Sequence, residues 1–471
     1  MTLLPQVRID YDARSNFFWL STDGTNTPTA ELNSYTPKGA RYDIDYTLIR
    51  NNPKVSGYTA DLVEDEITCT LRNDTLNRTQ LRLLNQIAAR ARWYNKSQQG
   101  YAIVLEVNIN VAGGEIWSRS KIYNIEIQHS EEIFNYGLAT GDIKVVLTIL
   151  REPFFEELSP VSLPVLNNSA LTIDVSNSPG WNINIIGTNI EGDTPTPAII
   201  GMANLTAAHT ITDIYLGMEV IEAGISNTSN ALMIEGESFT GGTLNTTNVN
   251  TDSGGATKTF TFPTSEAQIT KYTIPAVNIP KVGQWYKVFF RFSGTPGSSP
   301  NYIRYKFQKV GATTDEEVYF SSELYVYDMY KGLQDFGVVQ LPPYSIYAQG
   351  VPSTYEDIEF AIWGYTSGGT SGFQLDYVYF MPITGYRYYK ILGNNFDSSH
   401  ALTDENTDNN IYTTNIGDGK IIPNVTVFGD PIMLIPGYSH FFYLLWNSGN
   451  QNYIADQVRL SMQYRRRKNT L

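Results

Sequence analysis

The chain has few of the residues from which most catalytic and metal sites are built. Its 471 residues include one cysteine, Cys69, and four histidines that lie far apart in the sequence. A disulfide within the chain is therefore excluded, and the histidines do not have the spacing of a zinc site. Phosphate-binding glycine loops and strand-turn-helix serine motifs are also missing. We expect no enzyme activity, and we expect Cys69 to be a small buried side chain.

Long apolar runs and positive charge are scarce as well. No apolar run approaches the roughly 18 residues of a membrane-spanning helix, so we expect no membrane span. The N-terminus does not have the layout of a signal peptide. A net charge of −14 argues against nucleic-acid binding, which needs a basic surface. The basic run Arg465–Lys468 is a local exception. It is either a solvated strand end or an electrostatic contact with an acidic neighbour in an assembly.

Uncharged polar and aromatic residues are abundant instead. Charged residues make up only 17% of the chain, and 32 residues are tyrosine. Aromatic and β-branched residues suit a pleated, half-buried surface, so this composition is typical of antiparallel β structure rather than of disorder. The length predicts two to four domains.

Residues 1–160 have the pattern of a complete α+β domain. Apolar and polar residues alternate in several segments, such as Ile122–Gln128 and Ile143–Leu150, which indicates strands. From Thr79 to about Asn95, apolar residues recur at three- and four-residue spacing, which indicates one amphipathic helix. We predict a small β-barrel or sandwich with this helix across it.

The stretch Asn189–Ile200 opens a second domain. Pro195 and Pro197 exclude a helix and favour an extended entry into a strand. Short strands separated by loops rich in glycine and proline then follow, which indicates β-sandwiches. We predict a mainly β chain. Its second sandwich, residues 161–216 plus 388–471, would be split by an inserted jelly-roll sandwich at residues 217–387.

Three carboxylates in the insert suggest a structural cation. Glu235 and Glu237 are two residues apart in an expected strand, so both would face one side. Asp376 lies in the last expected strand of the insert. This resembles jelly-roll carbohydrate-binding modules, in which a Glu-x-Glu pair and a late aspartate join backbone carbonyls around calcium. Oxygen ligands suit such a cation. The alternative is carboxylates solvated at a sandwich edge.

Aromatic residues in the insert suggest a sugar-binding surface. Sugars lay apolar ring faces on aromatic side chains, while polar groups hold their hydroxyls. Trp363 and Tyr365 are expected at a strand end beside a glycine-rich loop, and Tyr347 lies in another loop. We predict that these three residues face a carbohydrate, whereas most other aromatics of the insert belong to the core.

Outside the insert, three segments resemble the distal tail proteins of phages with long non-contractile tails. The first is Leu150–Glu157, similar to the Arg-x-Pro-Phe/Trp-Glu close of that family's tube-like domain. The second is the turn and Pro-x-Pro opening at Gly192–Gly201. The third is the loop at Leu434–Tyr443 with the final strand Val458–Arg467. The match departs at Tyr438 and Ser439, where the family usually has asparagines.

The resemblance implies a structural role in a virion made in the bacterial cytoplasm. Subunits of this family form a hexameric ring that continues the tail tube, and they contact the tube protein and the hub or tip proteins. The second domain is galectin-like in the family, and inserts often bind host surface polysaccharide. Two alternatives stay open, a tail tube protein with a decorative domain and a stand-alone carbohydrate-binding adhesin. A polysaccharide hydrolase ranks third, because it needs carboxylates facing into a cleft.

Overall fold

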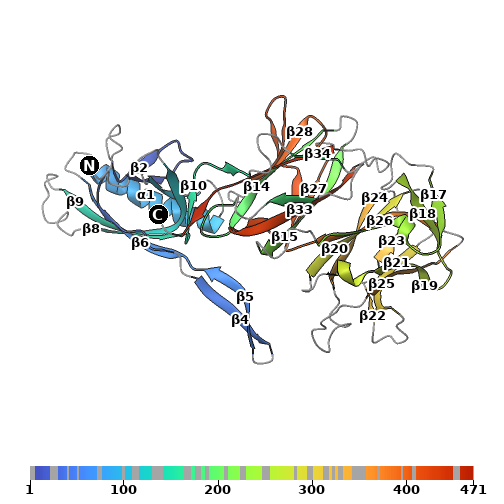
Figure 1. Ribbon diagram of the computed structural model, residues 1–471. Helices are drawn as coiled ribbons and strands as arrows, with labels where there is room; N and C mark the ends of the chain where they lie inside the picture. Colours follow the sequence, from blue (N-terminus) through green and yellow to red (C-terminus); the bar gives the residue numbers. More distant parts are fainter. Residues whose placement is uncertain are drawn as a thin grey trace. The chain divides into compact units, whose positions relative to one another are not determined.

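The chain folds as a mainly β protein with one helix among its described residues, as the sequence predicts (Figure 1). The structure is a computed structural model, which Figure 1 draws as a ribbon. It describes residues 6–21, 30–39, 42–49, 52–71, 77–97, 101–108, 116–129, 142–163, 171–174, 182–185, 190–205, 210–222, 230–246, 255–279, 284–293, 301–310, 318–320, 324–326, 332–341, 357–368, 372–393, 396–405, 410–448 and 457–469.

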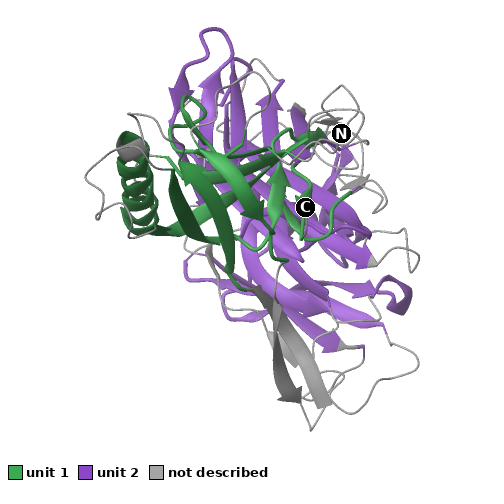
Figure 2. Cartoon of the chain, turned by 90° about the vertical axis from the view of Figure 1, so that its left-hand side faces the viewer, with its two compact units in different colours: residues 1–161, 191–196, 465–471 green, residues 162–190, 197–464 purple. Residues whose placement is uncertain are grey.

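The chain divides into two compact units, which Figure 2 shows in two colours. Unit 1 contains residues 1–161, 191–196 and 465–471, and unit 2 contains residues 162–190 and 197–464. The two short segments 191–196 and 465–471 differ from the sequence prediction, which placed them in the second sandwich. They belong to unit 1 because of ion pairs and backbone hydrogen bonds described below.

Unit 1 is built on one antiparallel sheet of nine strands and a separate hairpin. The hairpin joins β4 (Tyr42–Ile49) to β5 (Asn52–Ala60). The sheet follows the order β2 (Phe17–Trp19), β1 (Gln6–Asp10), β7 (Val104–Asn108), β8 (Trp117–His129), β9 (Ile143–Arg151), β6 (Val63–Leu71) and β3 (Glu31–Tyr35), with β10 (Phe155–Glu157) beside β8 and β35 (Arg467–Lys468) beside β10.

The helix α1 (Asn77–Ser97) packs on this sheet. Its apolar side, which includes Leu84 and Ile87, joins a core with residues from β6 and β9. Cys69 of β6 is fully buried in this core, as the sequence predicts, and burial raises the pKa of its thiol to about 12. The thiol therefore stays protonated at neutral pH and has little nucleophilic character.

Unit 2 contains four antiparallel sheets. Two of them are formed by strands from both sides of the insert. The larger contains β11 (Val161–Ser162), β34 (Gln457–Tyr464), β14 (Thr196–Asn204), β28 (His400–Glu405), β29 (Asn410–Asn415) and β30 (Ile421–Ile422), with β12 (Leu171–Asp174) and β32 (Met433–Leu434). The smaller contains β13 (Asn182–Ile185), β33 (Tyr438–Ser448), β15 (Ile211–Glu222), β27 (Gly385–Ile391) and β31 (Val425–Phe428).

The inserted segment forms the other two sheets, with a phenylalanine-rich core. Its described residues also form the short 3-10 turns η3 (Gly236–Ser238) and η5 (Ala276–Asn278). The six-stranded sheet contains β17 (Thr243–Asn245), β18 (Thr257–Thr261), β26 (Gly372–Pro382), β20 (Gln284–Ser293), β24 (Gly332–Leu341) and β16 (Leu232–Glu235). The five-stranded sheet contains β19 (Ala267–Ile274), β25 (Ile358–Thr366), β21 (Asn301–Lys309), β22 (Val318–Phe320) and β23 (Leu324–Val326).

Arg151, in the first of the three family-like segments, is a buried structural residue. Its side chain is fully buried, and Nε lies 2.5 Å from Asp65 Oδ2. The guanidinium also donates to the Lys38 carbonyl at 2.8 Å and lies 4.2 Å from the centre of the Phe155 ring. A buried arginine needs this full set of partners, because an unpaired buried charge is strongly destabilising.

The end of the chain returns to unit 1 through ion pairs. β35 pairs with β10, and Arg467 Nε donates to Glu156 Oε1 at 2.6 Å. Glu157 lies 3.1 Å from Arg466 Nη1 and 2.9 Å from Lys468 Nζ. The basic C-terminal run therefore contacts acidic side chains of its own chain. These contacts differ from both interpretations made from the sequence, because the run is not a solvated strand end and its acidic partners lie in the same chain.

The turn at residues 191–196 contacts the same C-terminal residues. The Asp193 N–H donates to the Arg467 carbonyl at 2.8 Å, and Arg466 Nε lies 2.6 Å from Glu191 Oε2. Gly192 has φ +135°, and a Cβ there would lie 2.9 Å from the Arg467 carbonyl oxygen. Only glycine fits so close to the final strand. We call the contacts among 151–157, 191–196 and 465–468 the C-terminal clasp.

The loop before β33 forms a defined turn in unit 2. The Tyr438 N–H donates to the Ile435 carbonyl at 3.2 Å, with Pro436 and Gly437 between them. Gly437 has φ +81°, as the third position of a type II turn requires. His440 is fully buried and accepts a hydrogen bond from the Ile435 N–H at its Nε2 (3.0 Å). Burial lowers the pKa of His440 to about 4.

No helix among the described residues is long and apolar enough to cross a membrane.

Breaking the C-terminal clasp should destabilise unit 1. We predict that Arg467→Ala lowers the free energy of unfolding by about 2 kcal/mol, because the buried Glu156 would lose its closest ion-pair partner and keep only Arg119 Nη2 at 3.7 Å. Arg459 is an exposed arginine on β34, and Arg459→Ala should change stability by no more than about 0.5 kcal/mol. Denaturant unfolding measures both variants. Equal stability of the two would contradict the assigned role of the clasp.

His440 should make unit 2 sensitive to acid. Its folded pKa of about 4 lies below the 6.5 of an unperturbed histidine, so the unfolded chain binds more protons at acid pH. The stabilisation is complete above pH 6.5 and is lost as the pH falls towards 4, by up to about 3 kcal/mol. His440→Gln keeps an acceptor for Ile435 but does not titrate. The stability difference between the two proteins should therefore shrink with acid, and a constant difference would refute the assignment.

Candidate functional site

Strand β25 turns the two predicted sugar-facing residues to one side of the insert. Phe360 and Ile362 lie in the buried core, so Trp363 and Tyr365, at alternate positions, face outward. The strand register brings polar and aromatic residues of β21 and β19 beside them. We call this surface of the five-stranded sheet the aromatic face, and its residues are Glu266, Lys271, Tyr302, Arg304, Lys306, Gln308, Glu359, Trp363 and Tyr365.

Aromatic and cationic side chains pair across this face. Tyr302 is opposite Tyr365, and their rings stack with centroids 4.3 Å apart and planes 9° apart. Lys306 is nearly buried, and its Nζ lies 4.5 Å from the centre of the Trp363 ring. Arg304 is directly opposite Trp363 in the register. Stacking and cation–π contacts hold these rings in fixed orientations.

Two carboxylates on the aromatic face are held by basic or amide groups. Glu359 is buried, with Oε2 2.6 Å from Lys271 Nζ, and its Oε1 accepts a hydrogen bond from Gln308. Glu266 forms an ion pair with Arg304. Because both oxygens of Glu359 are engaged, neither is placed to transfer a proton to a bound ligand.

The aromatic face has the chemistry of a binding surface. Flat rings offer apolar contact to a sugar, and the flanking lysines and arginine offer hydrogen-bond donors. Within the described part of the chain, the buried Trp363 Nε1 has no hydrogen-bond partner.

The structure brings two of the three predicted sugar-binding residues together. Trp363 and Tyr365 lie on one face, whereas Tyr347 lies outside the described residues. Sequence reasoning missed Tyr302, Lys306 and Glu359. The alternation of polar and apolar residues in β21 was a usable signal, but which residues oppose Trp363 depends on a strand register that the sequence does not contain.

The predicted calcium site has a different backbone from the one we expected. β16 ends at Glu235, and residues 236–238 form η3, so the prediction that Glu237 lies on the same strand is wrong. The chain turns at Gly236 because it approaches β26 closely. A Cβ at Gly236 would lie 2.1 Å from the Leu375 carbonyl oxygen and 2.8 Å from that of Asp376.

The side chain of Asp376 has another partner. It is fully buried, and its Oδ2 lies 2.8 Å from Arg291 Nε. The register of β20 against β26 shifts at this point, so that Arg291 opposes Tyr377 and Phe292 opposes Leu375. Asp376 is thus the extra residue of a β-bulge, which turns its side chain toward Arg291. Among the described residues, no three His, Cys, Asp or Glu side chains gather as a metal site.

The remaining oxygens are of the kind that a hard cation takes as ligands. Glu237 Oε2 is buried without a hydrogen-bond partner among the described residues. Glu235, Glu237 and the carbonyls of Leu375 and Asp376 would supply oxygen ligands only, which suits calcium. Lys258 Nζ donates to the Glu237 carbonyl at 3.2 Å, so that carbonyl is already occupied. Calcium stays a prediction, with the Asp376 carbonyl in place of its carboxylate.

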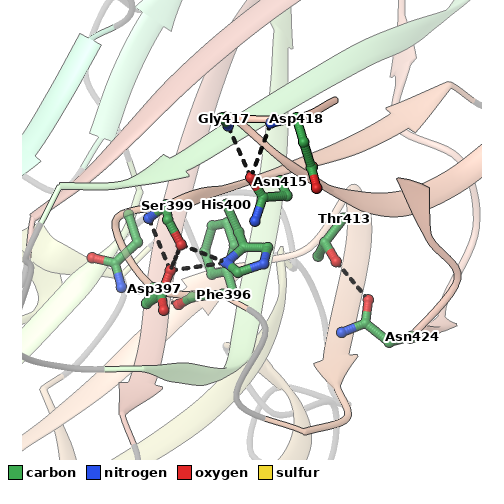
Figure 3. Close-up of polar contacts among 10 residues, drawn as sticks. Phe396, Asp397, Ser399, His400, Thr413, Asn415, Gly417, Asp418 and Asn424 are labelled. Atoms are coloured by element: carbon green, nitrogen blue, oxygen red, sulfur yellow. Dashed lines mark hydrogen bonds and ion pairs between the residues drawn. The ribbon is translucent and has the colours of Figure 1, made fainter. Parts of the chain in front are cut away.

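A serine, a histidine and an aspartate meet in a loop of unit 2, but not as a catalytic triad (Figure 3). Ser399 Oγ donates to Asp397 Oδ1 at 2.6 Å, and His400 Nδ1 lies 2.8 Å from the same oxygen. Ser399 is also 3.1 Å from Nδ1 rather than near Nε2. A triad needs serine and aspartate on opposite ring nitrogens. The hydrogen bond from Ser399 chiefly lowers the pKa of Asp397 to about 2 and fixes a turn.

Of three comparisons with known proteins, only the comparison with solved structures gave matches. No protein-family profile matches the chain. No curated protein matches it either. The chain is similar to the Dit protein (gp 19.1) of phage SPP1, described as a paradigm of hub adsorption apparatus in Gram-positive-infecting phages. The identity is 7%, the coverage is 98% of both chains, and the TM-score is 0.33.

Two structures of the phage P2 baseplate are also similar. In the activated conformation with Ca, the identity is 8%, the coverage is 100% of both chains and the TM-score is 0.28. In the activated conformation with Sr, the identity is 10%, the coverage is 79% of this chain and 97% of that chain, and the TM-score is 0.21.

Calcium binding can be tested by thermal unfolding. We predict that calcium stabilises the full chain, by about 2.7 kcal/mol at a concentration one hundred times its Kd. Glu237→Gln should remove this gain, because it replaces a buried carboxylate ligand. Glu64→Gln, at an exposed glutamate of unit 1, is the control and should keep the gain. Identical unfolding curves of the unmodified chain in calcium and in EDTA would refute the site.

Proposed function

We propose that this chain is a distal tail protein of a phage tail tip, whose copies form a hexameric ring that continues the tail tube. The observation that supports it most is the C-terminal clasp. Parts of all three segments that resemble the family contact one another there, through Arg467 with Glu156 and through Asp193 with the Arg467 backbone. Segments that are far apart in the sequence thus together form the C-terminal clasp.

The clasp suits a ring subunit that carries a large insert. The first and last segments of the chain are locked into one β unit, so residues added between them leave that unit unchanged. A ring of such units satisfies its edges by cyclic closure. In this proposal the ring contacts the tube protein on one side and hub or tip proteins on the other, within a virion assembled in the bacterial cytoplasm.

The insert would present the aromatic face to host surface polysaccharide. The stacked Tyr302–Tyr365 pair and the oriented Trp363 ring support this role, since fixed aromatic rings bind sugars at low entropic cost. The same face would also serve a stand-alone adhesin, which is the second candidate function. A tail tube protein with a decorative domain would form stacked rings instead of one ring.

The oligomeric state separates these functions. We expect light scattering after size-exclusion chromatography to give six subunits for the purified full chain, and negative-stain images to show single rings. Monomers at high concentration that still bind glycans would favour the adhesin. Long stacks of rings would favour the tube protein. Either result would contradict the proposed distal tail function.

Binding to host polysaccharide tests the insert. We predict that Trp363→Ala and Tyr365→Ala each weaken binding of the full chain to isolated cell-surface polysaccharide by about tenfold, because each removes a ring worth roughly 1–1.5 kcal/mol of stacking. Trp285 is a 53% exposed tryptophan on the six-stranded sheet of the insert. Trp285→Ala is the matched control, and equal losses in all three variants would argue against the aromatic face.

A further inference from the structure

The helix α1 has an exposed face whose charges are all basic, in a chain of net charge −14. Arg82, Arg90 and Lys96 are exposed along it, and Trp93 between them is 59% exposed. At 100° per residue, positions 82, 93 and 96 fall on one stripe, opposite the buried Leu84 and Ile87. Within the described part of the chain, these three basic side chains have no recorded ion pair.

The sheet beneath α1 has an acidic outer surface. In β6 the buried residues Asp65 and Ile67 face the core, and the alternate residues Glu64 and Glu66 are exposed. Glu126 of β8 is exposed on the same side. It and Glu66 both lie directly opposite Thr148 of β9, one from each side. No ion pair is recorded for Glu64, Glu66 or Glu126 among the described residues.

Other charged groups of unit 1 form ion pairs within the unit. Arg8 pairs with Glu106, Arg151 with Asp65, and the clasp residues with one another. On these two surfaces the charges without partners are sorted by sign, basic on the helix and acidic on the opposite surface of the sheet. One exposed lysine, Lys144, interrupts the acidic surface.

We infer that the exposed face of α1 binds the acidic outer surface of β6, β9 and β8 on a second copy of this chain. Arg82 and Arg90 are about 12 Å apart along the helix axis and about 80° apart around it, and Glu66 and Glu126 are about 10 Å apart across three strands. The long arginine side chains can bridge this difference in direction. Each copy offers both surfaces, so the contact is heterologous and repeats from copy to copy into a ring. This inference rests on the proposed ring and names its subunit contact.

Charge reversal with mixing tests the contact. Arg82→Glu with Arg90→Glu gives a subunit with two acidic surfaces, and Glu66→Lys with Glu126→Lys gives one with two basic surfaces. Each full-length variant alone should be monomeric by mass photometry at low salt. An equimolar mixture should recover rings of the wild-type mass, because acidic helices meet basic sheets and basic helices meet acidic sheets. Circular dichroism checks that each variant is folded.

The control changes net charge elsewhere. Lys420→Glu with Arg459→Glu reverses two exposed charges of unit 2 and should leave ring assembly unchanged. Wild-type rings that persist in both unit 1 variants would overturn this contact while the ring function stands. A mixture that stays monomeric would also overturn it. A wild-type chain that is monomeric under every condition would overturn both this contact and the proposed function.

Discussion

The contacts of Arg467 hold three distant segments of the chain together, 151–157, 191–196 and 465–468. Its side chain pairs with Glu156, and its backbone carbonyl accepts the Asp193 N–H, so one residue joins the close of the first domain to the entry of the second. Charges this well buried are costly without partners. The acidic pair at 156–157 and the basic run at 465–468 therefore depend on each other. The strand β35 and its ion pairs therefore belong to the fold of unit 1.

The pairing of strands from both sides of the insert explains how unit 2 tolerates it. The host sandwich of unit 2 is assembled from strands on both sides of the insert, as in the pairing of β15 with β27 and of β14 with β34. The insert leaves from the end of β15 and returns at β27, where Met218 is opposite Gly385. Residues can be added there without breaking either sheet. The insert closes its own core around residues such as Phe290 and Phe360, and it is free to present its aromatic face.

Periodicity was enough to predict the local elements, because alternation and helical spacing depend on neighbours in the sequence. The helix expected at Thr79–Asn95 is α1, and the strand expected at Ile143–Leu150 is β9. Periodicity could not predict contacts between residues that are far apart in the sequence. The register that puts Lys306 beside Trp363, the bulge that turns Asp376 to Arg291, and the return of Arg467 to Glu156 all depend on packing between distant segments. The 3-10 turn at Glu237 was missed because its cause, the approach of Gly236 to β26, is also tertiary.

The most direct measurement of the central claim is the position of this subunit in an intact particle. Cryo-electron microscopy of virions can locate it by the density of a β unit joined to a sandwich with a second sandwich inserted. The account predicts one ring of six copies at the end of the tail tube, with the inserted sandwich accessible to the outside. Density repeated along the whole tube, or no copy of the subunit in the tail, would contradict it.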